Sequence, residues 1–301
     1  MSPVPMAYSI QSKPNTQDIT MKYMNVWNLI QKGRHLSTRR RDPIKYMTKH
    51  ETPEEASLAW LLGTKSIIGT SAKVVMGEFY QWLTKVMYLA PFNLSGFQVC
   101  PFATPACKKD CLGHSAGNLV FQGQTEVLRT WSYYLHSELF HTKLDMAIKM
   151  LGMEAVFKGM QAAVRLNGSS DLDWSDVIER HAESGVQFYD YTKDFERAVA
   201  SIGTNYHLTY SISEKPESWE KGIYLVQRGG TAAVVTHRNK KKAAAFGQLL
   251  SDSFGVGVAD GDRHDLRFLD KGKLVTLTAK GSMKEESKFV WTREQFDKLA
   301  G

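Results

Sequence analysis

Residues 162–171 read Ala162-Ala-Val-Arg-Leu-Asn-Gly-Ser-Ser-Asp171, an apolar run that ends in a burst of polar residues. The same pattern recurs along the following part of the chain, in the runs Val186–Tyr191, His207–Ile212 and Ala232–Val235. The segments between these runs have helical patterns, namely Trp174–Ser184, Asp194–Ser201 and Ser218–Gly222. Short strands that alternate with helices are typical of βα units, whose strands pair in parallel. The sequence therefore predicts an α/β fold in which parallel βα units form a partial or complete TIM-like barrel.

Further elements are predicted on both sides of this block. Upstream, the apolar segments Ser66–Met76 and Gly77–Leu89 predict a strand followed by a helix, and residues 124–152 have one long helical pattern. Downstream, Leu274–Ala279 and Phe289–Leu299 predict a strand and a closing helix. Another helix is predicted to begin at Thr52-Pro-Glu-Glu55, because threonine caps a helix, proline suits its first position and glutamate completes a capping box.

The composition excludes several classes of protein. With 43% hydrophobic residues among 301, the chain can build a core, which excludes disordered, collagen-like and small disulfide-stapled proteins. No stretch reaches the roughly 18 uncharged apolar residues of a membrane span, and residues 1–15 lack the apolar region of a signal peptide. We therefore expect no membrane partner. Three cysteines without such a signal indicate a reducing compartment, in which they serve as thiols or metal ligands.

The positive charge of the chain is local. The formal net charge is +7, yet residues 32–49 alone carry seven basic residues against one acid, and Arg238 and Lys240–Lys242 form a second cluster. Such clusters attract phosphate backbones because each contact releases counterions, although solvated loops explain them about equally well. We predict a basic N-terminal arm at 1–55 and an α/β catalytic-type domain at 56–301. Nucleic-acid contacts, with DNA favoured, are expected from Arg39, Arg40, Arg41, Lys240 and Lys241.

In parallel α/β proteins the reactive groups gather at the carboxyl ends of the strands. Polar residues follow each predicted strand, so a polar pocket is expected at this rim. Arg165 lies within the first run, where a buried guanidinium requires an anion, supplied by Asp190 or by a ligand. Ser170 has a simpler alternative role as a helix cap. The candidates are Asp171, Asp190, Lys193 and Asp262 for catalysis, and Arg165, Asn167, Ser170 and Ser211 for cofactor binding.

All three cysteines fall within twelve residues, in Cys100-Pro-Phe-Ala-Thr-Pro-Ala-Cys107-Lys-Lys-Asp-Cys111-Leu-Gly-His114. Such crowding indicates a metal site, and Cys107 and Cys111 have the i, i+4 spacing that places both sulfurs on one helical face. With His114 the set is Cys₃His, a closed structural zinc site. With the cysteines alone, an iron–sulfur cluster keeps one iron open for a ligand. The spacing does not decide between zinc and an iron–sulfur cluster.

Several of these motifs together resemble a bacteriophage protein family named after a mycobacteriophage gene-88 product. The resemblance rests on Leu89-Ala-Pro, the cysteine motif, Arg165-Leu-Asn-Gly-Ser-Ser-Asp171, Phe188-Tyr-Asp-Tyr-Thr-Lys193, Asn205-Tyr-His-Leu-Thr-Tyr-Ser211 and Gly261-Asp-Arg-His-Asp-Leu-Arg-Phe-Leu-Asp270 with Ala279-Lys-Gly281. It covers most of residues 65–281 and implies a phage origin and a shared site built from these motifs. It implies no particular activity.

Three functions are compatible with these patterns. The first is a phage-encoded iron–sulfur enzyme with a radical-SAM-like partial barrel, which acts on a nucleic acid or nucleotide and holds S-adenosylmethionine on the open iron. The second is a zinc-stabilised DNA or RNA base transglycosylase, in which Asp171, Asp190 or Asp262 is the nucleophile or general base. The third is a non-catalytic nucleic-acid-binding protein with structural zinc. We expect the protein in the cytoplasm of the infected bacterial host.

Overall fold

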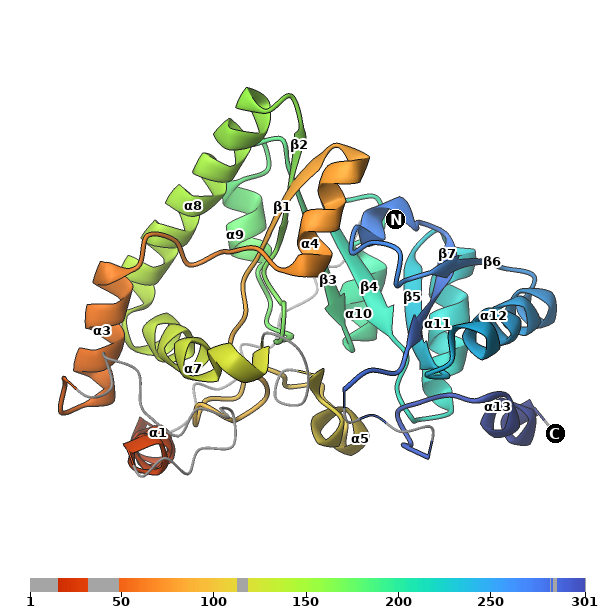
Figure 1. The fold of residues 1–301 in the computed structure, drawn as a ribbon, viewed down its shortest axis with the longest axis horizontal. Coiled ribbons are helices and arrows are strands. Elements are labelled where there is room, and N and C mark those ends of the chain that lie inside the picture. Colours follow the sequence, from red (N-terminus) through yellow and green to blue (C-terminus); the bar gives the residue numbers. More distant parts are fainter. Residues whose placement is uncertain (1–15, 32–48, 113–118, 282, 284–285, 301) are drawn as a thin grey trace, which may run out of the picture.

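The computed structural model describes residues 16–31, 49–112, 119–281, 283 and 286–300. Seven parallel strands form one curled sheet, an open half-barrel with the strand order β1-β2-β3-β4-β5-β7-β6 (Figure 1). The strands are β1 (Trp82–Val86), β2 (Gln161–Arg165), β3 (Val186–Thr192), β4 (Tyr206–Ser211), β5 (Thr231–Thr236), β6 (Gly257–Asp260) and β7 (Lys273–Thr278). The predicted α/β fold and partial TIM-like barrel are confirmed.

Helices connect the strands, as βα units require. Those that follow β2, β3, β4 and β5 are α9 (Ser175–Arg180), α10 (Phe195–Ala200), α11 (Glu217–Gln227) and α12 (Lys240–Phe254). Between β1 and β2 lie α5 (Pro105–Lys109), α7 (Leu119–Leu135) and α8 (Ser137–Phe157). The remaining elements are α1 (Thr16–Gln31), α3 (Pro53–Gly63), α4 (Ala72–Val75), η1 (Met76–Tyr80), η2 (Arg267–Leu269) and α13 (Arg293–Ala300).

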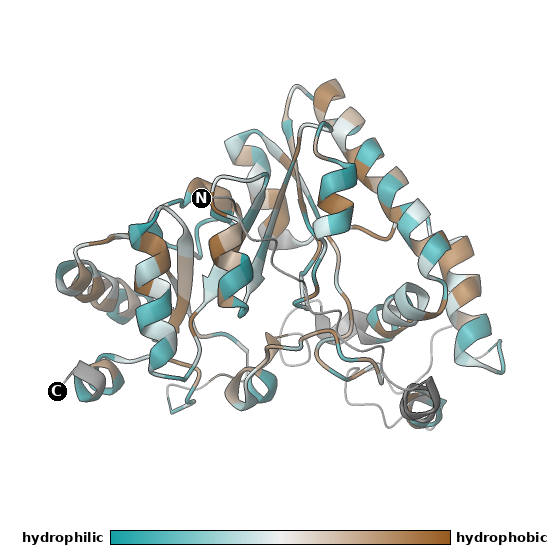
Figure 2. Cartoon of the chain, turned by 180° about the vertical axis from the view of Figure 1, so that it is seen from behind, coloured by the Kyte–Doolittle hydropathy of each residue, from teal (hydrophilic) through white to brown (hydrophobic). Residues whose placement is uncertain are grey.

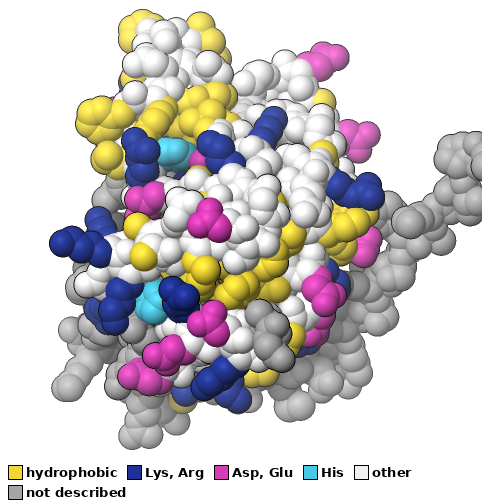
Figure 3. Space-filling model, turned by 90° about the vertical axis from the view of Figure 1, so that its right-hand side faces the viewer, with side chains coloured by type: hydrophobic (Ala, Val, Ile, Leu, Met, Phe, Trp, Pro, Cys, Tyr) yellow, Lys and Arg dark blue, Asp and Glu magenta, His cyan; other side chains and the backbone are white. Residues whose placement is uncertain are grey.

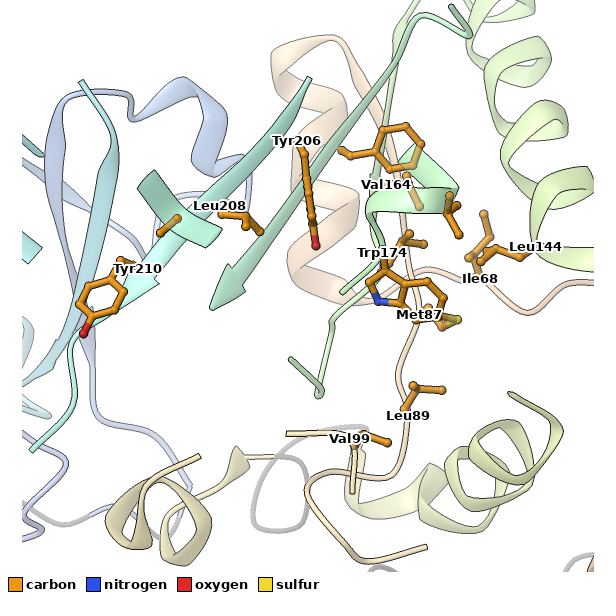
Figure 4. Close-up of a cluster of buried hydrophobic side chains, with 14 of the residues drawn as sticks. Ile68, Met87, Leu89, Val99, Leu144, Val164, Trp174, Tyr206, Leu208 and Tyr210 are labelled. Carbon is orange, nitrogen blue, oxygen red and sulfur yellow. The ribbon is translucent and has the colours of Figure 1, made fainter. Parts of the chain in front are cut away.

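The main core lies between the sheet and its helices. In β4, Tyr206, Leu208 and Tyr210 face the helices, while the residues between them face the opposite side of the sheet, as the two-residue period of a strand dictates. Figure 4 shows side chains of β2 and β4 beside Trp174 and Leu144, with Met87 and Leu89 on the chain that leaves β1. This apolar layer fixes the strands and leaves their carboxyl ends for polar loops.

The inner face of the half-barrel is filled by the segment 261–270, which follows β6. Leu266 and Phe268 of this segment pack against Ala163 and Tyr189 of the inner sheet face. The side chain of Arg267 is fully buried there. A half-barrel has no opposing strands to cover its inner face, so this segment supplies the missing layer of side chains.

Three predictions upstream of β2 need correction. Ser66–Met76 is not a strand and Gly77–Leu89 is not a helix: the first ends in α4, and the second contains η1 and then β1. Short apolar runs fit either element, and here the open edge of β2 recruits Trp82–Val86 as a partner. The long helical pattern at 124–152 is two helices, α7 and α8, which meet at His136, whose φ of −132° and ψ of 46° are not helical.

The predicted start of α3 is confirmed, because Thr52 accepts a hydrogen bond from the Glu55 backbone N–H and Pro53 is the first helical residue. Part of the predicted arm packs on the domain. In α1, Tyr23 stacks on Phe97 and Trp27 packs against Trp131. In the described part of the chain, no helix is long and apolar enough to cross a membrane.

Candidate functional site

A cavity of about 400 Å³ lies at the carboxyl ends of the strands. We call it the strand-end cavity. The loops that follow β1, β2, β3 and β4 and the region around β7 all contribute to its wall. The residues that line it include Cys100, Cys107, Cys111, Arg165, Ser170, Asp171, Lys193, Ser211 and Asp262. The structure thus brings most of the predicted catalytic, cofactor-binding and metal-binding residues together at one place.

The three cysteines share the wall of this cavity. None of them, all in the described part of the chain, forms a disulfide, and all are partly buried. The Sγ of Cys100 accepts a hydrogen bond from the Phe92 backbone N–H at 3.3 Å and donates to the Ser169 carbonyl at 3.6 Å. Burial raises the pKa of the Cys100 thiol to about 12, although the Phe92 N–H lowers it in part.

Helix α5, which carries Cys107, is held in place by hydrogen bonds to distant parts of the chain. Thr104 caps this helix by accepting from the Cys107 N–H at 3.3 Å. Glu214, from the loop after β4, accepts from the Thr104 hydroxyl at 2.6 Å and from the Ala106 N–H at 3.2 Å. Asp110 accepts from the Ser287 hydroxyl. Glu214 is not among the site residues predicted from the sequence, because a contact across 110 residues has no local signal beyond the capping pattern of Thr104-Pro105.

The loop after β2 is held by the side chain of Asn167. Its amide donates to the Leu172 carbonyl at 2.8 Å, and its Oδ1 accepts from Ser170 at 2.7 Å and from Trp174 at 3.1 Å. Asn167 is buried behind the cavity surface and positions the loop. Ser170 does line the cavity and caps no helix; its hydroxyl is bonded to Asn167.

Close packing also shapes this loop. A Cβ on Gly168 would lie 2.6 Å from the Met87 carbonyl oxygen and 2.6 Å from the Tyr88 ring. Only glycine allows the loop to lie this close to the chain that leaves β1.

Asp171, Lys193 and Ser211 lie together in the cavity wall. The Asp171 carboxylate accepts from the Lys193 backbone N–H at 2.9 Å and from Arg197 at 3.3 Å. Burial raises the pKa of Asp171, and the Lys193 N–H and the Arg197 charge lower it in part. The Lys193 ammonium donates to the Ser211 hydroxyl at 2.8 Å and lies 4.8 Å from the centre of the Phe289 ring. A carboxylate and an ammonium therefore stand on one wall, as the charged ends of a zwitterionic ligand require.

Asp190 lies behind this wall and does not line the cavity. It is fully buried and accepts from the Asn167 backbone N–H at 2.7 Å and from the Tyr206 hydroxyl at 2.8 Å. Burial raises the pKa of Asp190 to about 7, against the lowering effect of Arg165. Through its hydrogen bond with the Asn167 backbone, Asp190 holds the loop after β2 in place.

Arg165 has the carboxylate partner that its position in a strand requires. The nearer one is Asp265, whose Oδ2 lies 3.2 Å from Arg165 Nη1; Asp190 Oδ1 lies 3.9 Å from Arg165 Nε. The guanidinium also lies 4.8 Å from the centre of the Tyr191 ring. Asp265 was missed as a site residue, although the motif 261–270 carries it, because nothing local places that motif inside the barrel.

Asp262 lines the other side of the cavity. It accepts from the Thr278 hydroxyl at 2.5 Å and from the Lys280 ammonium at 2.6 Å. Burial raises the pKa of this carboxyl, but the hydrogen bonds from Lys280 and Thr278 outweigh burial and leave it lowered. A carboxylate whose charged form is stabilised by these hydrogen bonds is better placed to position a ligand than to take up a proton.

The two candidate metal centres require different arrangements of the cysteine sulfurs. Among the described residues, no group of three or more His, Cys, Asp and Glu side chains could hold a single ion. Zinc holds sulfur at about 2.3 Å, which brings its ligand sulfurs to within about 4 Å of one another. In an iron–sulfur cluster each cysteine binds a different iron, so its ligand sulfurs stand farther apart than those around one zinc ion. His114, the predicted fourth zinc ligand, lies outside the described residues.

A family model matches residues 60–293, which contain all seven strands and every described residue of the cavity named above. The model is that of Gene product 88. The chain belongs to the Gene product 88 family. This confirms the resemblance seen in its motifs. No curated protein and no solved structure matches the chain.

In this Gene product 88 protein, the predicted nucleic-acid residues fall in two places. Lys240 and Lys241 are exposed in the first turn of α12, at the same edge of the sheet as the cavity, where Asn239 caps the helix. Arg39, Arg40 and Arg41 lie outside the described residues. Figure 3, which faces the side of α12 and α13, shows basic side chains interspersed with acidic ones. The described surface on this side is therefore mixed in charge.

Proposed function

We propose that this Gene product 88 protein is an iron–sulfur enzyme of the radical-SAM type that acts on a nucleic acid or nucleotide. The observation that carries the proposal is that three thiols line one cavity at the carboxyl ends of a parallel half-barrel. The donor set fits, because three cysteines hold a four-iron cluster and leave one iron open. When bound, such a cluster and S-adenosylmethionine would supply hydrogen-atom abstraction from a substrate.

The protein's own residues have distinct roles in this proposal. Cys100, Cys107 and Cys111 hold the cluster, and Glu214 sets the position of the helix that carries Cys107. Lys193 binds the carboxylate of the cofactor, and Asp171 accepts from its amino group. Both residues line the cavity, and their opposite charges suit the two charged ends of an amino acid.

The same wall of the cavity also offers hydrogen-bonding groups to the remaining parts of the cofactor. Ser170 and Ser211 offer hydroxyls to the polar atoms of the cofactor, since both line the cavity. Asn167 and Asp190 keep the loop and Arg165 in place from behind. They are positioning residues in this proposal, because neither reaches the cavity surface.

The cavity limits how a substrate is presented. A volume of about 400 Å³ suits small molecules and is far too small for a duplex. A nucleic acid would therefore present a single nucleotide, from a single strand or by flipping a base. The lysines at the start of α12 support a polyanionic substrate because they lie at the same edge of the sheet.

The decisive experiment is anaerobic purification followed by iron, sulfide and zinc analysis and visible and electron paramagnetic resonance spectra. We expect about four irons per chain and a brown protein, with the colour lost in Cys100→Ala, Cys107→Ala and Cys111→Ala. His114→Ala is the matched control and should keep the iron. Stoichiometric zinc in a colourless protein, lost on His114→Ala, would contradict the proposal and favour the zinc-stabilised alternatives.

A further inference from the structure

Helix α8 exposes an apolar stripe on its outer face. The stripe consists of Met146, Met150, Met153 and Phe157, whose side chains are between 58% and 92% exposed. Their spacing of 4, 3 and 4 residues places all four on one side of the helix. The opposite side of α8 is buried against the core. Brown segments accordingly recur along the whole length of α8 in Figure 2.

Further exposed apolar residues extend this stripe at both ends. Leu62 lies near its beginning, where Lys143 of α8 donates to the Leu62 carbonyl at 3.4 Å. Val156 lies at its end, next to Phe157, and is also exposed. Large contiguous apolar patches on soluble proteins mark interaction sites. The α8 patch consists of the stripe together with Leu62 and Val156.

We propose that a second copy of this chain packs on the α8 patch, with the two α8 helices antiparallel about a two-fold axis. A spacing of 4-3-4 is the same in both directions, so an antiparallel copy presents the same stripe. Met146 then faces Phe157 of the partner subunit, and Met150 faces Met153 of the partner subunit. This self-matching is what an isologous interface requires, and the spacing is that of a coiled-coil seam.

The size and the rim of the patch favour a protein partner. Its six side chains each expose on the order of 100 Å², so a dimer would bury on the order of 600 Å² per copy, of the same order as the roughly 800 Å² of a standard interface. Both signs of charge flank the stripe, in Lys143, Asp145, Lys149, Glu154 and Lys158. A membrane-surface helix carries mainly Lys and Arg on its polar face, whereas an interface has a mixed polar rim.

The proposed interface leaves the strand-end cavity open. α8 covers the outer side of β1 and β2 (Figure 1). Its stripe lies on the face of the helix opposite to the residues that are buried against the core. The proposal is therefore independent of the metal and of the reaction.

Light scattering and sedimentation over a range of concentrations test the proposal. We expect the full-length protein to be a dimer and Met150→Lys/Met153→Lys to be a monomer with an unchanged circular dichroism spectrum and melting temperature. Ile202→Lys is the matched control, since it places a lysine at an exposed apolar residue outside the patch and should remain a dimer.

A charge-exchange variant tests the register. In Met150→Lys/Met153→Glu, the two-fold axis places opposite charges face to face, so the dimer should return. A monomeric wild-type protein at about 100 μM would overturn the proposal. So would a dimer that survives Met150→Lys/Met153→Lys, or binding to lipid vesicles by a protein that stays monomeric.

Discussion

Asp265 Oδ2 lies 3.2 Å from Arg165 Nη1 and joins the segment after β6 to the carboxyl end of β2. The Tyr189 hydroxyl donates to the same oxygen at 3.3 Å. Both charged side chains are largely buried, so each needs the other to offset the loss of hydration. This ion pair fixes the segment 261–270 on the inner face of the half-barrel and orients Arg165 in the cavity wall.

Replacement of Asp265 by asparagine should therefore destabilise the fold. Removal of one partner leaves the other charge buried, which costs about 3 kcal/mol in the free energy of unfolding. Urea denaturation measures this cost. Asp297→Asn is the control, since its pair with Arg293 is exposed and should change stability by less than about 1 kcal/mol. Equal effects of the two substitutions would show that the Arg165 pair does not hold the segment.

Glu126 should make stability depend on pH. In the described part of the chain neither of its carboxylate oxygens has a hydrogen-bond partner, and burial raises its pKa from 4.5 to about 8, with Arg129 lowering it in part. The folded state therefore retains a proton that the unfolded state loses. Between pH 4.5 and 8 this group should lower the free energy of unfolding by up to about 1.4 kcal/mol per pH unit.

The variant Glu126→Gln tests this prediction. It removes the titrating group, so its advantage over the wild type should grow from pH 5 to pH 8 in urea denaturation. Glu179→Gln is the control at an exposed glutamate and should follow the wild type at every pH. A difference between Glu126→Gln and the wild type that stays constant with pH would refute the assignment.

Gly168→Ala should disrupt the wall of the strand-end cavity. Its Cβ would meet a backbone oxygen and the Tyr88 ring at 2.6 Å, so the loop after β2 must move. We expect a loss of about 1–3 kcal/mol in the free energy of unfolding and reduced metal content after anaerobic purification. Gly69→Ala is the matched control, because nothing lies within 4 Å of its added Cβ. Unchanged stability and metal content in Gly168→Ala would contradict the close packing.

Neutralising Lys240, Lys241 and Lys242 to alanine should weaken binding to single-stranded DNA. If all three contact phosphates, the slope of log K against log salt concentration should fall by about two. Fluorescence anisotropy at several salt concentrations measures this slope. Replacement of Arg39, Arg40 and Arg41 by alanine gives a second variant for the same measurement. Lys271→Ala/Lys273→Ala is the control, since these exposed lysines lie at the opposite end of β7. Identical slopes in wild type and variant would exclude α12 from the binding surface.

Short apolar runs in the sequence were sufficient to predict five of the seven strands closely, namely β2, β3, β4, β5 and β7. β1 was mistaken for a helix, because its five residues acquire strand structure only by pairing with β2. The split between α7 and α8 at His136 was also missed, since both helices continue one apolar pattern.

The sequence by itself determined the βα architecture, the family and the grouping of three cysteines, because each depends on local patterns. Only the tertiary structure decided which polar residues face the cavity. Asp171 and Lys193 reach it, whereas Asp190, on the strand between them, faces away into the core. The tertiary structure also paired Arg165 with Asp265, which follows it by 100 residues. Such partners are fixed by how the sheet curls and by what fills its inner face, and no local pattern encodes either of these.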